Sequence, residues 1–264
     1  MSIELRKFSE PIPKVQCLMC TYGRFNRVQR AVSCFLDQDY PNKELLILNN
    51  HPIPLETVLP NIKIFNEPGY PTLGHCRTRI TELSSAELSR TFDDDDLFLP
   101  WTISQGVTHL KDGYAAWKPT KSWFSIPTQK HRLMGNSMEA AILYRTYIGK
   151  KYGFRLGGGD EHAPLLNAFG KEGGLLETDM GVMTSYIYRW GHGEWHISGS
   201  LGSSTVELRT ENWKKHNQDT GEGKKLEKID VSEYWRNLLK DVKDTFTPEE
   251  YERLKDKFNQ YGVS

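Results

Sequence analysis

Four consecutive aspartates, Asp93 to Asp96, stand between two apolar segments in the first half of the chain. Adjacent like charges repel one another, so a folded chain keeps them together only where cations neutralise them. Residues 89–92 are expected to form a buried strand, and acidic side chains at the carboxyl end of a strand lie where α/β proteins bind ligands. Hard oxygen donors favour Mg²⁺ or Mn²⁺. The tract therefore predicts a metal site at a sheet edge, with a solvated acidic turn or a helix cap as the alternative.

The first hundred residues alternate between short apolar runs and amphipathic segments. Apolar runs predict buried strands, and apolar residues at helical spacing predict helices. We expect strands at residues 15–21, 44–48, 62–65 and 89–92, with helices at 28–38 and 74–83. Strands that alternate with helices are typical of an α/β fold with a mostly parallel sheet.

The pattern is less regular after residue 101. We expect strands at 114–117, 138–143 and 181–190, helices at 144–151 and 165–169, and a polar loop at 198–228. Helical periodicity returns from Trp235 to Phe246, and a further helix is expected to begin at Thr247, with Glu250 completing a capping box. This organisation predicts a main domain over residues 1–200 and a loop and helical C-terminal extension over residues 201–264.

Composition excludes some locations and cofactors. No run approaches the roughly 18 apolar residues of a membrane span, and the first residues lack the apolar core of a signal peptide. The four cysteines lie within or beside apolar segments, and the pair Cys17 and Cys20 has no second pair to complete a zinc site. We therefore expect buried thiols, a reducing cytoplasmic environment and no membrane span.

Charge is uneven along a chain whose net charge is zero. Residues 118–155 contain eight basic residues and one acidic residue, Glu139, a local excess of seven positive charges. Aromatic side chains are interleaved, and basic and aromatic groups together serve phosphate contact and base stacking. Scattered, solvated lysines are the alternative explanation.

Four motifs follow one another along the chain, at residues 20–24, 35–41, 74–79 and 92–100. In this order they resemble the GT-A fold glycosyltransferases of the family-2-like branch, over about residues 14–200, and more weakly its phage-encoded members. The resemblance implies an α/β fold of GT-A type, a mostly parallel sheet with flanking helices, an acceptor subregion and a C-terminal helical appendage. It divides the main domain into a nucleotide-sugar-binding half, residues 14–100, and an acceptor half, residues 101–200.

The resemblance also implies candidate site residues. The residues expected to bind the nucleotide-sugar donor are Thr21, Tyr22, Arg24, Asn50, Arg77, Arg79, Asp93 and Asp94. Among them Asp93 would meet the ribose or the water shell of the metal, and Arg77 or Arg79 would balance diphosphate charge. Mn²⁺ or Mg²⁺ would be bound by Asp95 as the principal ligand, with Asp96 as a further ligand or as a residue that orients Asp95. A late histidine would complete the site, with His196 as the first candidate and His192 as the second.

Two departures from the family pattern leave choices open. Family members commonly carry an aspartate after the second strand to hold the nucleotide base, whereas here Asn49, Asn50 and His51 follow the strand. The motif that carries the general base reads Asp160-Glu161-His162, so the base is either Asp160 or Glu161. A carboxylate base implies a single displacement that inverts the anomeric configuration. A helix cap is the alternative role for these carboxylates.

The basic aromatic segment falls in the acceptor half, where the candidate acceptor residues are Trp117, Lys118, Lys121, Trp123 and Arg132. Its positive charge favours an anionic acceptor. The phage likeness favours hydroxymethylated phage DNA, on whose extruded base the aromatic side chains would stack.

The predicted function is metal-dependent transfer of a hexose or pentose from a nucleotide sugar to an acceptor hydroxyl. A UDP-sugar is the expected donor, DNA is a candidate partner, and the cytoplasm is the expected location, which is that of the host if the chain is phage-encoded. The alternatives are transfer to a cell-surface glycan or a lipid-linked sugar, a nucleotidyltransferase, and a non-catalytic module that binds nucleic acid or glycan.

Overall fold

A computed structural model describes residues 12–135, 139–156, 161–190 and 225–263. Strands and helices alternate through its first part as the sequence predicts. The elements there are β1 (Val15–Thr21), α1 (Phe25–Leu36), β2 (Lys43–Asn49), β3 (Glu56–Thr57), β4 (Ile62–Asn66), α2 (Leu73–Leu83) and β5 (Leu88–Thr91). All the predicted strands and helices of this part are confirmed, with ends that move by one to three residues.

The main sheet of the described residues has seven strands in the order β11-β7-β10-β5-β1-β2-β4. β1 pairs in parallel with β2 and β5, and β2 pairs in parallel with β4. Across the pair of β1 and β2, Thr21 lies opposite Asn49, so the two carboxyl ends are level. The loops that follow β1, β2 and β5 therefore leave the sheet at one edge, which is where such sheets bind ligands.

The remaining strands of this sheet come from the second half of the chain. β10 (Leu143–Arg145) pairs antiparallel with β5 and with β7 (Ala116–Pro119), and β11 (Leu175–Thr178) pairs in parallel with β7. The sheet is thus mostly parallel with one antiparallel insertion, which confirms the predicted fold class. Helices α4 (Thr146–Tyr152) and α5 (Ala163–Lys171) follow at the positions predicted for them.

A second sheet in the described residues was not predicted. Its strand order is β6 (Leu97–Phe98), β12 (Tyr186–Arg189), β8 (Lys121–Ile126) and β9 (Gln129–Gly135). β8 and β9 form an antiparallel hairpin, and β9 exposes most of its polar side chains, so it carries no apolar run to mark it. The helix α3 (Thr102–His109) is short and contains Gly106 and β-branched residues, which lowers its helical signal.

Two predicted strands are wrong in part. Residues 139–141 form a 3₁₀ turn, and the strand begins only at Leu143. Residues 181–183 form a second 3₁₀ turn, and β12 begins only at Tyr186. Ala140, Ala141 and Val182 of these turns are buried, and burial alone does not distinguish a turn from a strand.

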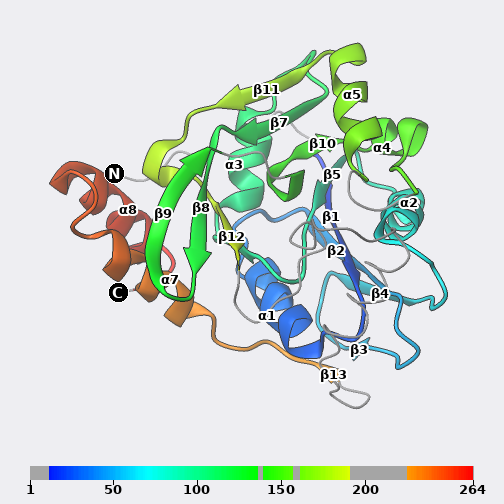
Figure 1. The fold of residues 1–264 in the computed structure, drawn as a ribbon, viewed down its shortest axis with the longest axis horizontal. Coiled ribbons are helices and arrows are strands. Elements are labelled where there is room, and N and C mark those ends of the chain that lie inside the picture. Colours follow the sequence, from blue (N-terminus) through cyan, green and yellow to red (C-terminus); the bar gives the residue numbers. More distant parts are fainter. Residues whose placement is uncertain (1–11, 136–138, 157–160, 191–224, 264) are drawn as a thin grey trace.

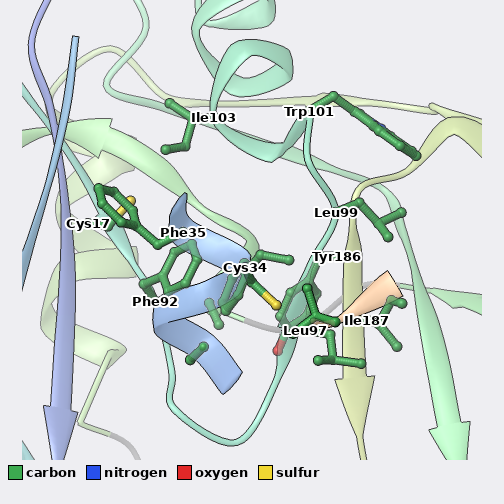
Figure 2. Packing of buried hydrophobic residues seen from close by; sticks show 14 of the residues in the cluster. Cys17, Cys34, Phe35, Phe92, Leu97, Leu99, Trp101, Ile103, Tyr186 and Ile187 are labelled. Atoms are coloured by element: carbon green, nitrogen blue, oxygen red, sulfur yellow. The ribbon is translucent and has the colours of Figure 1, made fainter. Parts of the chain in front are cut away.

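Side chains alternate across β1, so the main sheet is covered on both faces. Cys17 and Met19 pack on the side of α1, whereas Leu18 and Cys20 pack on the side of α2. Figure 2 shows the cluster around α1, in which Phe35 and Cys34 lie beside Phe92 and Tyr186. The ring of Phe92 stacks on Phe98 at a centroid distance of 3.7 Å, which fixes the chain immediately before and after the aspartates.

The C-terminal helices α7 (Ser232–Val242) and α8 (Pro248–Asn259) belong to the same hydrophobic cluster as α1. Figure 1 shows both helices beside β8 and β9, and Asp241 of α7 accepts a hydrogen bond from the His131 backbone N–H of β9 at 3.1 Å. The predicted capping box is confirmed: the Thr247 side chain and that of Glu250 each accept from the other's backbone N–H. These helices therefore complete the core of the main domain.

The strand β13 (Lys225–Leu226) pairs with β3 and closes the described part of the C-terminal region onto the first half of the chain. All four cysteines are buried and form no disulfide, as predicted. None of the helices in the described ranges combines the length and the apolar character needed to cross a membrane.

Candidate active site

The aspartate tract forms the connection between β5 and β6 at the carboxyl edge of the main sheet. Its side chains alternate between the interior and the surface. Asp94 and Asp96 are buried, whereas the side chains of Asp93 and Asp95 are 23% and 15% exposed. Two of the four carboxylates are therefore held inside the protein, and the other two reach toward solvent.

Asp94 is held by two side chains at the end of β1. Arg24 donates from Nε to Asp94 Oδ2 at 2.9 Å and also pairs with Oδ1 through Nη2, while the Thr21 hydroxyl donates to Oδ2 at 2.6 Å. A bidentate guanidinium is the strongest partner that a side chain offers to a carboxylate. Burial raises the pKa of the Asp94 carboxyl to about 6, although the Arg24 charge opposes that rise.

Arg24 also holds the next aspartate, because its Nη1 lies 3.0 Å from Asp95 Oδ2. One buried guanidinium thus pairs with two adjacent carboxylates and offsets part of their charge. The segment that follows β1 therefore folds onto the end of β5 through this residue.

Asp96 faces the second sheet. The Tyr186 hydroxyl donates to its Oδ2, and the Arg189 backbone N–H donates to its Oδ1 at 3.0 Å. Burial raises the pKa of the Asp96 carboxyl well above its ordinary range. Both oxygens are therefore engaged by β12, so Asp96 anchors the tract to the second sheet in this structure. Asp95 is the more accessible of the two aspartates predicted as metal ligands.

The donor set suits a divalent cation that is shared with a substrate. Mg²⁺ sites of this kind use one or two carboxylates and substrate phosphates rather than a full protein cage. Asp95 and Asp93 offer partly exposed carboxylate oxygens at the sheet edge, and no group of three or more potential ligands occurs among the described residues. The predicted ligands His192 and His196 lie outside the described residues.

Of the two candidate bases, Asp160 lies outside the described residues and Glu161 lies just before α5. The Glu161 side chain is 14% exposed, with His162 Nε2 at 3.4 Å and Arg77 Nε at 3.7 Å from its Oε1. Burial raises the pKa of Glu161, but the neighbouring His162 and Arg77 together lower it to about 2. Glu161 is therefore ionised at neutral pH.

The two candidate arginines of α2 have different surroundings. Arg77 is buried, and its Nη2 lies 2.8 Å from Asp93 Oδ1. Arg79 lies at the surface, where its Nε donates to Glu67 Oε2 at 2.9 Å. Residues two apart on a helix point in different directions, so helical spacing predicts that only one of them reaches the aspartates. The structure shows that it is Arg77.

The end of β2 differs from the predicted arrangement. The Asn50 amide accepts from the backbone N–H groups of Gly69 and Tyr70 at 2.8 and 2.9 Å, and donates to the Tyr70 carbonyl at 2.7 Å. These contacts hold a turn and give no support to the prediction that Asn50 binds the donor base. The part-exposed rings at this edge are Tyr22 and His51, whose centroids are 4.9 Å apart in an edge-on contact.

The prediction that Trp117 and Trp123 stack on an acceptor is wrong for this structure, because both are fully buried. Trp117 donates from Nε1 to the Thr178 hydroxyl at 3.0 Å, and Trp123 packs edge-on against Phe246. Both tryptophans are core residues.

Part of the positive charge of the same segment is paired with acidic residues outside it. Lys118 pairs with Glu177 at 3.1 Å, and Lys121 pairs with Asp179 at 2.8 Å. Arg132 lies on β9 and donates to Gln129. The fold thus brings acidic residues of β11 and of the turn after it next to Lys118 and Lys121.

His162 is a buried group that the sequence analysis did not single out as a site residue. Its Nδ1 is buried and has no hydrogen-bond partner in the described part of the chain, while its Nε2 faces Glu161. Its position directly after two candidate bases is the signal that could have identified it.

Comparisons with protein-family models and with curated proteins find no match. Solved structures do match. TarS from S. aureus in complex with UDP-GlcNAc aligns with a TM-score of 0.55 and 11% identity, over 94% of this chain and 72% of TarS. The mannosyltransferase PcManGT from Pyrobaculum calidifontis, in complex with GDP-Man and Mn²⁺, aligns with a TM-score of 0.53 and 11% identity, over 97% and 84% of the two chains.

The fold is of the GT-A type. In this GT-A chain the candidate residues come from the loops that follow β1 and β5, from α2 and from the residues before α5. Arg24, Arg77, Asp93, Asp95 and Glu161 are thus brought together from four separate segments.

Proposed function

We propose that this chain is a metal-dependent glycosyltransferase that moves a sugar from a nucleotide-sugar donor to an acceptor hydroxyl. The observation that carries the proposal is the pair of partly exposed carboxylates, Asp93 and Asp95, held by the buried cations Arg77 and Arg24 at the carboxyl edge of a GT-A sheet. Buried ion pairs of this kind fix the carboxylates in place before a ligand arrives.

The donor would be a nucleotide sugar, with a UDP-sugar as the first candidate. TarS is described with UDP-GlcNAc and PcManGT with GDP-Man and Mn²⁺, which supports a nucleotide sugar and a divalent cation for this chain too. Asp95 would hold Mn²⁺ or Mg²⁺, with Asp93 beside it, and Asp96 would orient Asp95 from the interior. When bound, the metal stabilises the negative charge that develops on the departing diphosphate.

Glu161 is the candidate general base among the described residues, with Asp160 as the alternative. An ionised carboxylate accepts a proton from the acceptor hydroxyl as that oxygen attacks the anomeric carbon. Because attack from the face opposite the leaving group is a single displacement, the proposed reaction inverts the anomeric configuration.

An anionic acceptor such as hydroxymethylated DNA stays a prediction without support from the described residues. The burial of Trp117 and Trp123 and the pairing of Lys118 and Lys121 leave little of the surface from which it was predicted. A DNA acceptor requires affinity for duplex DNA that falls steeply with salt. Absence of such binding would leave a glycan or a lipid-linked sugar as the acceptor.

The proposal is tested by incubating the protein with Mn²⁺ and a panel of UDP-, GDP- and CMP-sugars and measuring release of the nucleotide. A glycosyltransferase releases nucleotide from one or a few donors, by slow hydrolysis without an acceptor and faster with one, and a chelator abolishes release. Asp112→Asn is the control for Asp→Asn substitutions in the aspartate tract, because the Asp112 side chain is fully exposed. If the wild-type protein releases no nucleotide from any donor, with Mn²⁺ or Mg²⁺ and across a panel of glycan, lipid-linked and DNA acceptors, the proposal is wrong.

A further inference from the structure

Arg77 touches both carboxylates that the proposed reaction places on different segments. Its Nη2 lies 2.8 Å from Asp93 Oδ1, on the connection after β5, and its Nε lies 3.7 Å from Glu161 Oε1, just before α5. The Arg77 side chain is 7% exposed. A planar guanidinium presents several donors in fixed directions, so a single Arg77 conformation sets where both carboxylates lie.

The helix that carries Arg77 is also fastened to the segment that leads to Glu161. The Thr72 hydroxyl at the start of α2 donates to the Leu156 carbonyl at 2.6 Å, and the Arg155 backbone N–H donates to the Glu161 carbonyl at 2.8 Å. At Gly74 a Cβ atom would lie 1.9 Å from the Arg155 carbonyl oxygen. The first turn of α2 therefore approaches this segment as closely as only glycine permits.

We infer that Arg77 is a positioning residue that clamps Glu161 at a fixed place relative to Asp93. The inference rests on the proposed function for the meaning of the two carboxylates. Without Arg77, the part-exposed carboxylates of Asp93 and Glu161 would lose the cation that they share, and leaving a largely buried charge without its partner destabilises a fold. Glu161 would then move or take up a proton, and in either case it would no longer serve as the base.

The Nε atom of Arg77 shows how closely Arg77 and Glu161 approach one another. It is buried and has no hydrogen-bond partner in the described ranges, and Glu161 Oε1 is 3.7 Å away. That distance is an ionic contact slightly longer than a hydrogen bond. A small shift of Glu161 toward Arg77 would satisfy this buried donor with a hydrogen bond.

A double-mutant cycle on stability tests the clamp without any activity assay. The variants are Arg77→Gln, Glu161→Gln and the double variant, unfolded in urea at pH 7. Arg77→Gln alone should raise the unfolding constant by about a hundredfold, because it leaves buried charges unpaired. The unfolding constant of the double variant should be about tenfold smaller than that of Arg77→Gln, because Glu161→Gln removes one of the two unpaired carboxylate charges.

The matched control pair is Lys255 and Glu252, which form an exposed ion pair at 3.1 Å on the surface of α8. Their cycle should be additive to within about twofold, as is usual for surface pairs. If the cycle on Arg77 and Glu161 is equally additive, the clamp does not exist and the inference is overturned.

A second cycle, on kcat, distinguishes positioning from a general structural role. Glu161→Gln should lower kcat by roughly 10² to 10⁴, and Arg77→Gln should lower it by at least roughly tenfold in the wild-type background. In the Glu161→Gln background, Arg77→Gln should lower kcat by a clearly smaller factor than in the wild-type background, since the part of its effect that acts through Glu161 is already lost. Full additivity in this cycle would overturn the positioning role.

The two hypotheses fail in different ways. If the wild-type protein transfers sugar and Arg77→Gln leaves kcat unchanged, the inference falls and the proposed function stands. If the stability cycle is strongly coupled but the wild-type protein releases no nucleotide from any donor, the clamp stands and the proposed function falls.

Discussion

Replacing Arg24 with methionine should destabilise the protein more than any surface substitution, and the loss should grow with pH. Arg24 is 5% exposed and pairs with Asp94, which is fully buried, and with Asp95. Removing one partner of a buried ion pair costs about 3–5 kcal/mol. For a chain of this length, a loss of about 3 kcal/mol corresponds to a Tm lower by roughly 6–12 °C.

The pH dependence follows from Asp94. Its pKa is raised to about 6 in the folded protein with Arg24 in place, and without the Arg24 charge it rises further. Above pH 6 the wild-type carboxyl ionises, whereas the variant must keep Asp94 protonated in the folded state although it ionises in the unfolded state. A folded state that binds more protons than the unfolded one loses stability as pH rises. The destabilisation should therefore grow by about 1.4 kcal/mol per pH unit above pH 6.

The assay is urea unfolding of wild type and Arg24→Met at pH 6, 7 and 8, followed by circular dichroism and by tryptophan fluorescence. Arg253→Met on the exposed side of α8 is the control, and it should change the free energy of unfolding by less than about 0.5 kcal/mol. A variant as stable as wild type at pH 8, or a loss that is the same at all three pH values, would refute the assigned coupling between Arg24 and Asp94.

Three further substitutions probe other parts of the structure. Thr247→Ala removes one half of the capping box of α8 and should lower the free energy of unfolding by about 1 kcal/mol, measured by urea unfolding, with Thr247→Ser nearly neutral. Phe92→Ala empties a fully buried position between Phe35 and Phe98 and should cost about 3–5 kcal/mol; a loss below about 1 kcal/mol would show that the ring is not packed as described. Gly74→Ala places a methyl group against the Arg155 carbonyl and should lower turnover more than it weakens nucleotide binding. Turnover equal to that of the wild-type protein would show that the contact at Arg155 relaxes without affecting the site.

The parallel half of the fold could be predicted because short stretches of sequence indicate each of its strands and helices. The strands β1 and β2 are buried along nearly their whole length and contain apolar runs, and α1 has one apolar face. β5 is also buried, but Leu88 is the only apolar residue among its four, so its position before the aspartates marks it more than its composition does. The hairpin β8–β9 was missed because β9 is a largely exposed strand with polar side chains. Its place in the second sheet depends on β8 and α7, which lie elsewhere in the sequence.

The candidate site could be located from sequence but not resolved. The aspartate tract lies at the end of β5 as predicted, yet nothing in four identical residues indicates that Asp94 and Asp96 are buried. That pattern depends on Arg24 and Tyr186, which are about seventy and ninety positions away. The same limit explains why the tryptophans were misassigned. The sequence of a basic segment does not distinguish an aromatic side chain that stacks on a ligand from one that fills the core, and Trp117 and Trp123 fill the core.

The most direct test of the proposed function is calorimetric titration of UDP, GDP and CMP into the protein with and without Mn²⁺. The account predicts that at least one nucleotide binds, that its binding requires Mn²⁺, and that Asp95→Asn lowers its affinity by at least about tenfold while leaving the protein folded. It predicts no such loss for Asp112→Asn, whose side chain is fully exposed. Failure of all three nucleotides to bind in the presence of Mn²⁺, or undiminished Mn²⁺-dependent binding to Asp95→Asn, would contradict the central claim that this sheet edge is a metal-dependent nucleotide-sugar site.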